Sequence, residues 1–555
     1  MATVKSSMRG ALALIVGAGL VVFVPSLFTR DPWNPDEPRA VEVAREMVVL
    51  GNYLVPHLNG EPYSEKPPLF YWLAAGFWHL GAGLNSGRMV SALAATGTAL
   101  LVYALGRRVH SPETGLVAAL ITMASALLVY IGKYGVLDPL LAFLTTASVY
   151  SSTRAFEGGA GRGRWWLAAY AAAALAVLAK GPPGLAVAVA APLAYGFALR
   201  REVRKGGWWH LAGGALLAGI VAAWLVPACL SGGKAYAHDI LLQQTAKRIS
   251  GAAPHENPPY FYLARFPIIF APWTLILVAA LAWAARSARA QRDRAGLLAA
   301  AWLAVVFVCF SLFAGKRERY LLPLIPAVGL LCARYVAGVA RGEHPPLRWH
   351  HALWRATFAA IGACAIGLAV VALAPGVGAA ELVSDPAMQA ELKGLVTPLG
   401  RAAAFAAALF VLAACLWGIL SQRGAAGERR RVIATLAAVA ILSIYIDLGA
   451  TPPLNQVWSG RQLLVRAGRF FAEADEVYLY RDDLNGTLNL FSARVRIPVL
   501  QDEAALNAVV RSGRKVAVVL KESDAETLGD RVPWHKVARR LVVHRPTCVM
   551  ANWKP

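Results

Sequence analysis

Long apolar runs recur along this chain and constrain its fold more than any other feature. They return from Ala11 to Gly449, each long enough to cross a hydrocarbon core about 30 Å thick, which takes roughly 20 helical residues. Inside a membrane only helices or closed barrels satisfy every backbone polar group, and runs of this length indicate helices. With 57% of its 555 residues hydrophobic and 16% charged, the chain is predicted to be an all-α polytopic membrane protein.

The positions of these runs predict about thirteen transmembrane helices. They are expected at 10–28, 88–106, 113–131, 138–153, 165–180, 183–199, 209–229, 265–285, 296–314, 320–339, 351–374, 401–421 and 431–449. The first run follows Lys5 and Arg9 and shows no evident cleavage site before Arg30, so we interpret it as an uncleaved first helix.

The run at residues 67–84 determines the topology of every later loop. At about 1.5 Å per residue it barely reaches across a bilayer, and Trp72, Trp78 and His79 favour the interface, so we interpret it as an interfacial helix. With the N-terminus inside, the arginine clusters between later runs then face the cytoplasm, as the positive-inside rule requires. The net charge of +23 is thereby explained by topology, and no nucleic acid partner is implied.

The same topology places a soluble C-terminal region on the external face. Residues 451–555 alternate strand-like runs with helical segments such as DEAALNAVVRSG; the strand-like runs are VYLY, RIPVL, KVAVVL and RLVVH. We predict a small α/β domain there, after a transmembrane domain at 1–450. No nucleotide fingerprint occurs in it, and the six cysteines form neither a CxxC metal pattern nor a disulfide framework.

Acidic residues mark two of the external segments. Asp36 and Glu37 lie in NPDEPRAVEVAREM, within the external loop 29–87, and Asp138 lies in YGVLDPLL at the outer end of a predicted span. Asp36 and Asp138 could simply cap helices, and a cap at Asp36 would stabilise its helix by about 1 kcal/mol. Ionisable groups at the membrane boundary are nevertheless functional candidates, because a lipid-bound phosphate or sugar would lie there.

Cations and aromatic side chains accumulate on the same external side. Lys66 could be a snorkelling anchor at the headgroup level or a phosphate ligand. The others belong to LAKGPPG, to the external loop 230–264 and to the turn GKRERY; they are Lys180, Arg248, Tyr262, Lys316, Arg317, Arg319 and Tyr320. Because cations outside break the positive-inside pattern, they favour an anionic substrate at that depth.

Six segments together resemble a known family. They are NPDEPRAVEVAREM, GNYLVPHLNGEPYSEKPPLFYW, VLDPLLAF, LAKGPPG, HENPPYFY and KRERYLLPLIPA. They resemble the polyprenol-phosphate-sugar-dependent GT-C glycosyltransferases, which include protein O-mannosyltransferases and the bacterial lipid A aminoarabinose transferase. The similarity is greatest to the aminoarabinose transferase and extends through about residue 335. It implies a GT-C fold with about thirteen transmembrane helices, an active site at the periplasmic face of the bacterial inner membrane, and an undecaprenyl-phosphate-linked sugar donor.

The resemblance also implies roles for individual residues. Asp36 resembles the family's catalytic carboxylate, and Asp138 resembles its second functional acid. Lys66, Arg248 and Tyr320 resemble groups that hold the lipid phosphate.

Further roles concern a bound cation and the sugar or acceptor pocket. A divalent cation (Zn²⁺, Mg²⁺ or Mn²⁺) is expected at Glu65 and His255, although a lone histidine is usually not a ligand. The pocket candidates are Glu37, Arg39, Lys180, Tyr262 and Lys316. The chain departs from its relatives at Arg39-Ala40, where they often have Arg-Tyr, and at the unusually basic KRERY turn.

The expected reaction is inverting transfer of a sugar, such as 4-amino-4-deoxy-L-arabinose, to a periplasm-facing acceptor such as lipid A phosphate, the chemistry of polymyxin resistance. Asp36 would act as general base on a hydroxyl acceptor, or orient the sugar if the acceptor is an already ionised phosphate. Transfer to protein or to another envelope glycan is an alternative within the enzyme class. A lipid transporter or flippase is another, but the internal repeats typical of transporters are not found.

Overall fold

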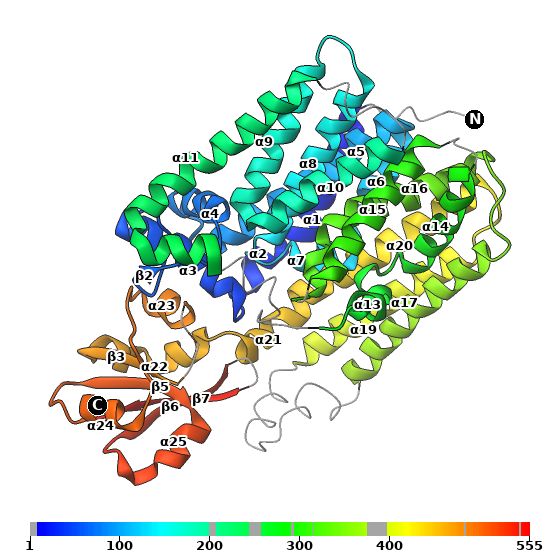
Figure 1. Ribbon diagram of the computed structural model, residues 1–555. Coiled ribbons are helices and arrows are strands. Elements are labelled where there is room, and N and C mark those ends of the chain that lie inside the picture. Colours follow the sequence, from blue (N-terminus) through cyan, green and yellow to red (C-terminus); the bar gives the residue numbers. More distant parts are fainter. Residues whose placement is uncertain are drawn as a thin grey trace.

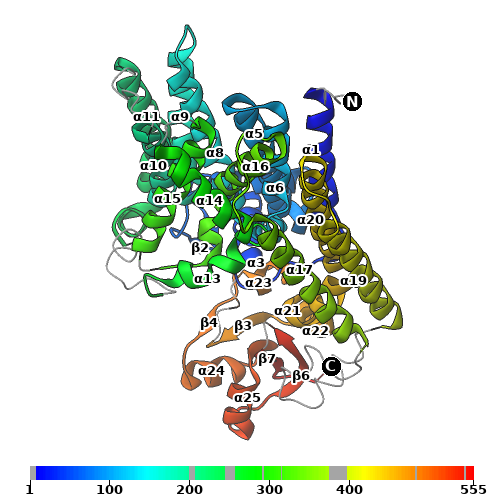
Figure 2. The same cartoon turned by 90° about the vertical axis from the view of Figure 1, so that its right-hand side faces the viewer.

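Helices dominate the computed structural model, which describes residues 8–198, 207–243, 257–289, 293–313, 315–373, 397–481, 484, 486–542 and 545–554. Long helices form a bundle, and a small domain containing a sheet packs against one end of it (Figure 1). The first helix begins at the opposite end of the bundle, as Figure 2 shows.

The first part of the bundle runs from the N-terminus to residue 243. Its helices are α1 (Met8–Phe23), α2 (Pro25–Thr29), α5 (Ser86–Val109), α6 (Pro112–Met123), α7 (Ala126–Ile131), α8 (Asp138–Glu157), α9 (Arg162–Lys180), α10 (Pro182–Ala198) and α11 (Trp208–His238), with a π turn at Asp239–Gln243.

The second part completes the bundle. Its elements are α13 (Phe261–Ile269), α14 (Thr274–Arg289), α15 (Arg294–Leu312), the 3₁₀ segment η4 (Glu318–Leu324), α16 (Ile325–Arg341), α17 (His350–Leu373), α19 (Pro398–Ile419) and α20 (Ala425–Tyr445). Each of the thirteen predicted spans overlaps one of these helices or a broken pair of them. The predicted all-α polytopic fold is confirmed.

The lengths of the helices match a membrane protein. Seven described helices are long and apolar enough to cross a membrane, or eight if α13 and α14, which are bent by 112°, form one span. Three shorter apolar helices accompany them, at Pro112–Met123, Pro182–Gly196 and Gly296–Leu312. Within residues 67–84 the α-helix is α4 (Leu69–His79), and the 3₁₀ turn η1 (Gly83–Asn85) follows it. The 11 residues of α4 are too short to cross a bilayer, which agrees with the interfacial interpretation.

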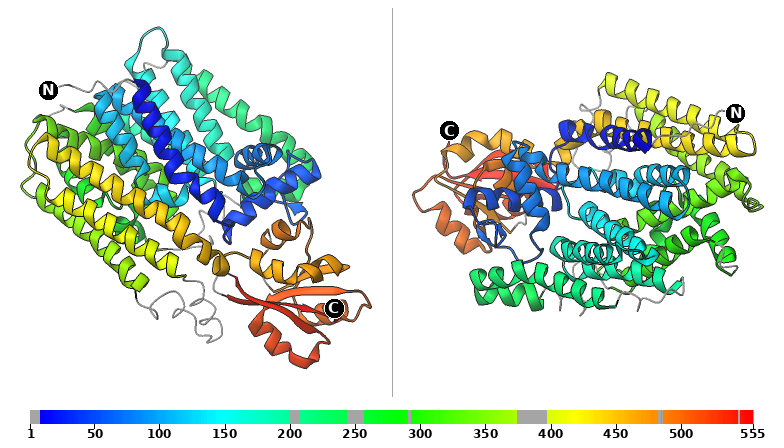
Figure 3. Two further views of the ribbon diagram at one scale, coloured as in Figure 1. Left: turned by 180° about the vertical axis from the view of Figure 1, so that it is seen from behind. Right: turned by 90° about the horizontal axis from the view of Figure 1, so that it is seen from above.

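Helix α3 (Asp36–Leu50) carries the first acidic pair and lies at the end of the bundle that faces the small domain (Figure 3). It ends at Gly51, whose φ of 65° supplies the left-handed turn that stops a helix. Its apolar face packs on α4 through small side chains such as Ala40 and Ala44. The strands β1 (His57–Leu58) and β2 (Glu61–Pro62) follow as a short hairpin.

The C-terminal region is the predicted α/β domain. Its strands are β3 (Glu476–Tyr480), β4 (Val499–Leu500), β5 (Val516–Lys521), β6 (His535–Val542) and β7 (Arg545–Ala551), in the order β4-β3-β5-β7-β6. Strand β3 is parallel to β4 and β5, whereas β7 is antiparallel to β5 and β6. Strand β7 was not among the predicted strands.

Helices cover this sheet and connect it to the bundle. They are α21 (Thr451–Trp458), α22 (Arg461–Glu473), α23 (Thr487–Ser492), α24 (Glu503–Val510) and α25 (Glu522–Leu528), preceded by a π turn at Ile446–Ala450 and followed by a 3₁₀ turn at Gly529–Arg531. Helix α22 buries Leu463, Ala467 and Phe471 against the sheet, because these residues recur at helical spacing on one face.

Candidate active site

Two acids begin two separate helices at the end of the bundle that faces the sheet domain. Asp36 is the first residue of α3, and Asp138 is the first residue of α8. A helix N-terminus favours a carboxylate through its partial positive charge. The N-cap positions themselves, Pro35 and Leu137, make no side-chain capping bond. Both acids instead contact cations from distant parts of the chain.

Asp36 is held by two arginines, Arg317 just before η4 and Arg319 within it. Its Oδ2 lies 2.9 Å from Nη1 of Arg317 and 2.9 Å from Nη1 of Arg319. Arg319 also reaches the second acid, with its Nε 3.7 Å from Asp138 Oδ2. One guanidinium therefore joins the two carboxylates that the sequence singled out.

Lys180 completes the arrangement from the C-terminal end of α9. Its Nζ donates to Asp138 Oδ1 and lies 4.3 Å from the centre of the Tyr320 ring. Asp138 and Lys180 are only 4% and 9% exposed, so their interaction is little screened by water. The structure thus brings Asp36, Asp138, Lys180 and Tyr320 into one cluster.

Lys66 lies beside this cluster. The ring of its neighbour Pro67 is 3.9 Å from the position that a Cβ on Gly181 would occupy, which places the Lys66 segment against the end of α9. The Lys66 ammonium donates to the carbonyl of Glu65 at 3.2 Å. Glu65 is exposed, and its carboxylate accepts a hydrogen bond from Tyr63 at 3.1 Å.

Two residues predicted to form the pocket instead hold the backbone of residues 316–319, which we call the arginine turn. Tyr262 is fully buried and donates to the carbonyl of Arg317 at 3.2 Å. Lys316 is 3% exposed and donates to the carbonyl of Asn257 at 2.8 Å. Both contacts brace the backbone that presents Arg317 and Arg319.

Glu37 differs from its neighbour Asp36 in its burial and in its partners. It is fully buried, with its carboxylate oxygens 3.1 Å from Arg30 Nη2 and 2.6 Å from Arg88 Nε. The backbone N–H groups of Trp33 and Gly135 also donate to it, at 3.1 and 2.9 Å. Glu37 therefore anchors α3 to α5 and faces away from the pocket assigned to it from the sequence.

Arg39, the second pocket candidate on α3, is partly buried. Its Nε is enclosed and has no hydrogen-bond partner among the described residues. Burial raises the pKa of the Tyr63 and Tyr71 phenols, and the nearby charge of Glu65 adds to this rise. The positive charge of Arg39 acts on both phenols in the opposite direction. Arg39 and Glu65 thus lie near the same two tyrosines.

The ionisation of Asp36 follows from these neighbours. Burial alone would raise the pKa of its carboxyl, but the charges of Arg319 and Arg317 and their hydrogen bonds outweigh burial. The pKa therefore lies below the ordinary value of 3.8, and the group is a carboxylate at neutral pH. A carboxylate that binds two guanidiniums is a weak base, whereas an efficient general base has a pKa near the working pH.

Two predicted site residues, Arg248 and His255, lie outside the residues that the structure describes. The predicted phosphate and metal roles of these two residues remain predictions. Within the described residues, the predicted cation site consists of the single exposed carboxylate of Glu65.

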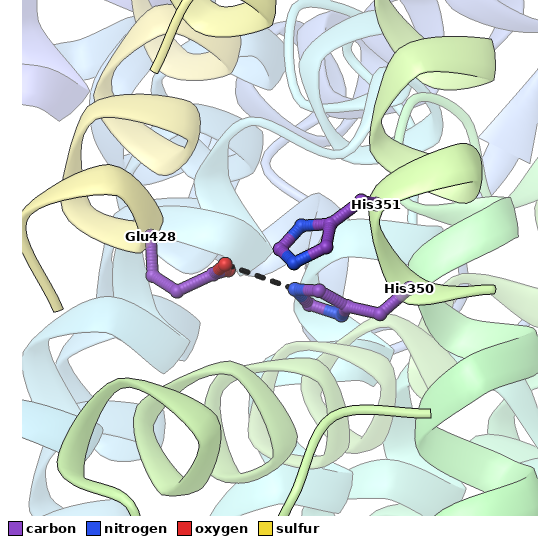
Figure 4. Close-up of side chains that lie close together, drawn as sticks. All are labelled: His350, His351 and Glu428. Atoms are coloured by element: carbon purple, nitrogen blue, oxygen red, sulfur yellow. Dashed lines mark hydrogen bonds and ion pairs between the residues drawn. The ribbon is translucent and has the colours of Figure 1, made fainter. Parts of the chain in front are cut away.

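A different cluster of metal-binding side chains lies at the other end of the bundle. His350, His351 and Glu428 bring their ligand atoms within 4.8 Å of one another (Figure 4). His350 Nε2 is 2.9 Å from Glu428 Oε1, which also accepts from Arg431, while Trp354 donates to Oε2 at 3.1 Å. Because both oxygens already accept donors, the cluster is a hydrogen-bonded tie between α17 and α20.

The two arginines were the part of the site that the sequence did not assign. Both were recognised as external cations in GKRERY, but neither was paired with an acid. The signal in the sequence is that both arginines lie in one short basic segment, KRER. The backbone at Arg317 is extended, with φ −141° and ψ 148°, and Arg319 lies in the 3₁₀ segment η4.

Comparisons with known proteins agree with the resemblance found in the motifs. Residues 8–243 match the family model described as dolichyl-phosphate-mannose-protein mannosyltransferase. The chain is 31% identical over 345 residues to undecaprenyl phosphate-alpha-4-amino-4-deoxy-L-arabinose arabinosyl transferase 2 of Proteus mirabilis, and the match covers 61% of each chain. It is 33% identical over 344 residues to arabinosyl transferase 2 of Sodalis glossinidius, over 60% of each chain. The matches thus span less than two thirds of these relatives' own length.

A solved structure resembles the chain along its whole length. ArnT from Cupriavidus metallidurans bound to undecaprenyl phosphate superposes with a TM-score of 0.77 at 20% identity, covering 99% of both chains. The apo form of the same protein gives 0.78 and 98% coverage of both chains. The chain therefore has the GT-C fold of these proteins, including the C-terminal sheet domain, and the resemblance to the aminoarabinose transferases is confirmed.

Proposed function

We propose that this chain is an inner-membrane glycosyltransferase that moves 4-amino-4-deoxy-L-arabinose from undecaprenyl phosphate to lipid A phosphate or a similar periplasm-facing acceptor. The observation that carries the proposal is Arg319, which bridges Asp36 and Asp138 at one end of a membrane bundle. The names of the relatives, which combine undecaprenyl phosphate with this sugar, support the choice of donor.

The orientation belongs to the proposal. The N-terminus is assigned to the cytoplasm, and the sheet domain and the Asp36 cluster to the periplasm. Support comes from the arginine clusters at Arg107, Arg108 and 423–431, which lie at the end opposite the sheet domain, where the positive-inside rule expects the cytoplasm.

Charge balance favours a lipid-linked phosphate as the ligand. Arg317, Arg319 and Lys180 carry three positive charges against the two carboxylates of Asp36 and Asp138, which leaves a net charge of one positive unit. A sugar joined to polyprenyl phosphate carries a single negative charge on its phosphodiester. The two charges are complementary, and Lys66, whose neighbour Pro67 lies near Gly181, adds a further cation at this end of the bundle.

The same cations favour the transition state over the ground state. When the bond between the anomeric carbon and the phosphate oxygen breaks, the departing polyprenyl phosphate gains negative charge while the sugar ring gains positive charge. Cations aimed at the phosphate therefore bind more strongly as the reaction proceeds, which accelerates the chemical step. Attack from the side opposite the phosphate inverts the anomeric carbon.

We assign Asp36 to the sugar ring, which gains positive charge in this transition state. As a carboxylate it offsets charge on the ring and orients the sugar, and the same carboxylate keeps Arg317 and Arg319 in place. Its lowered pKa makes it a poor proton acceptor while both arginines are bound. An acceptor that is already ionised, such as a lipid A phosphate, needs no base, which favours it over a hydroxyl.

A divalent cation is not required by this account. Glu65, one predicted ligand, is a single exposed carboxylate that already accepts from Tyr63. The other predicted ligand, His255, lies outside the described residues, and one carboxylate alone is too few ligands for Zn²⁺ or Mg²⁺. A metal at Glu65 and His255 therefore stays a prediction, and none of the steps above uses it.

Reconstitution tests the proposal directly. Purified protein in proteoliposomes would receive undecaprenyl phosphate-linked 4-amino-4-deoxy-L-arabinose together with lipid A, and mass spectrometry would follow the lipid A. Gain of one aminopentose, lost in Asp36→Asn, is expected. No gain by wild-type protein would contradict the choice of donor or acceptor.

A second candidate is transfer to protein. It is favoured by the match of residues 8–243 to the protein mannosyltransferase model. Adding a Ser/Thr-rich peptide and a polyprenyl phosphate-linked mannose to the same vesicles separates the two, because only a protein O-glycosyltransferase would glycosylate the peptide.

A further inference from the structure

One segment of the sheet domain, residues 486–497, contacts α3 and the residues on either side of it. Figure 2 shows α23, which begins this segment, directly beside α3. We propose that this segment, which we call the α3 clamp, positions Asp36 for catalysis. The catalytic consequence rests on the proposed function, whereas the positioning itself does not.

The tightest contact is between backbones. Gly486 has φ +86°, and a Cβ added to it would lie 2.9 Å from the Cα of Arg39. No real side-chain carbon approaches a backbone atom so closely, so the clamp can reach α3 here only through glycine. Arg39 lies in the first turn of α3, three residues after Asp36.

The next residue of the clamp fixes the entry to α3. Thr487 is 1% exposed, and its hydroxyl donates to the side-chain carbonyl of Asn34, two residues before Asp36. Nearby, the indole of Trp33 donates to Asn455 at 2.8 Å and stacks on Trp458, with ring centroids 5.9 Å apart. The chain that leads into Asp36 is thus held by the sheet domain and by α21.

The middle of α3 is tied to the clamp by hydrogen bonds from Arg45, which an ion pair within α3 holds in place. Arg45 is fixed by both oxygens of Glu42, each 2.7 Å away. The same guanidinium donates to the carbonyls of Arg494 and Ala493, at 3.3 and 3.5 Å. Because Glu42 and Arg45 are both buried, this contact is protected from water.

The hairpin after α3 forms the last attachment. Asn59 donates to the carbonyl of Ile497 at 3.0 Å and accepts from its N–H at 2.6 Å. Asn489 of α23 also donates to Asn59, at 2.8 Å. Glu46 of α3 accepts the N–H of Asn59 at 2.7 Å, so hairpin, helix and clamp are one network.

These contacts explain why a soluble domain is attached to a membrane enzyme. Asp36 begins α3, so any tilt of that helix moves its carboxylate relative to Arg317 and Arg319. A misplacement of about 1 Å at a reacting group can cost about 100-fold in rate. The clamp therefore acts as a positioning element, not as a catalytic group.

A matched pair of glycine variants tests the clamp. Gly513 also has a left-handed φ, of +78°, in the same domain, but a Cβ there would meet nothing within 4 Å. Gly486→Ala and Gly513→Ala thus carry the same kind of backbone strain, and only Gly486→Ala pushes against α3. Hydrogen exchange of residues 34–50, measured by mass spectrometry in lipid nanodiscs, reports the position of α3 without any substrate.

We expect Gly486→Ala to exchange faster than wild type in this helix and to lower kcat about 10- to 100-fold with a KM for donor within about twofold. Gly513→Ala should match wild type in both. Equal exchange and equal kcat for the two variants would overturn the proposal, as would faster exchange with unchanged kcat.

Threonine variants keep the test valid if Gly486→Ala does not fold. Thr487→Val removes the hydroxyl without changing the shape, and Thr487→Ser restores it. Faster exchange and lower kcat in Thr487→Val, with recovery in Thr487→Ser, support the clamp; no difference between Val and Ser contradicts it. If wild-type protein transfers no sugar from the proposed donor, the donor assignment fails and hydrogen exchange alone decides the positioning.

Discussion

Arg317 Nη1 lies 2.9 Å from Asp36 Oδ2, although the two residues are 281 positions apart in the chain. This contact joins the first residue of α3 to the segment that leads into η4 and α16. It also means that the acid expected to perform the chemistry is bound by the cations expected to hold the phosphate. Occupancy of the site by a phosphate would therefore redistribute the arginines between two anions.

Removal of the Asp36 charge should stop transfer without loss of donor binding. Asp36→Asn keeps the shape of the side chain but no longer offsets positive charge on the sugar, so kcat should fall by about 100- to 10,000-fold. Donor saturation curves and single-turnover rates measure the two effects. Glu113→Gln removes an equal charge from an exposed position in α6, far from the site, and should leave kcat unchanged.

The pH dependence of Asp36 follows from its lowered pKa. A carboxyl whose folded-state pKa is depressed contributes fully above its unfolded value, and the contribution is lost only as pH falls through the folded pKa. For Asp36 that loss lies below pH 3.8. Infrared difference spectra of wild type against Asp36→Asn should show no protonated Asp36 carboxyl at neutral pH. A protonated band that belongs to Asp36 above about pH 5 would contradict the assigned ion pairs.

The two arginines should differ in importance, because only Arg319 contacts both acids. Arg319→Gln leaves Asp36 with Arg317 and Asp138 with Lys180 but disconnects the two halves of the site. We expect a loss of about 100-fold in kcat/KM for Arg319→Gln and about tenfold for Arg317→Gln. Arg469→Gln, which disturbs an exposed pair with Glu473 in α22, serves as the control. Equal losses in the two site variants would argue against the bridge.

The transmembrane helices could be predicted because hydropathy is a local property. Each span can be recognised from about 20 consecutive apolar residues. The short helix α4 could be told apart from the spans by its length and its tryptophans. Strand β7 was not predicted because its sequence, RPTCVMA, begins with polar residues and a proline. The strand forms through its pairing with β5 and β6.

The site could be predicted only in part, for a geometric reason. Asp36 and Glu37 are adjacent, and successive residues on a helix point about 100° apart, so one faces the arginine turn while the other faces α5. Sequence alone does not tell which is which. The partners of both acids come from other elements, and no local pattern encodes a contact such as Arg319 with Asp36.

Glu37 should matter for stability more than its neighbour does. Glu37→Gln would leave the buried guanidiniums of Arg30 and Arg88 without a counter-charge, and breaking a buried pair in this way costs about 3–5 kcal/mol. Glu157→Gln, which breaks a partly exposed pair with Arg108, should cost at most about 1 kcal/mol. Unfolding in detergent measures both. Similar losses in the two variants would contradict the anchoring role of Glu37.

Lys66 should separate donor binding from chemistry. Its neighbour Pro67 lies near Gly181 at the end of α9, next to Lys180, where the phosphate of a lipid-linked donor would sit. Lys66→Ala should raise the donor KM and lower kcat, each by about tenfold, whereas Lys66→Arg keeps the charge and much of the activity. Undecaprenyl phosphate alone should raise the Tm of wild type and of Asp36→Asn, because binding to the folded state stabilises it. In Lys66→Ala that shift should shrink; a shift as large as that of wild type would assign the phosphate to other cations of the cluster.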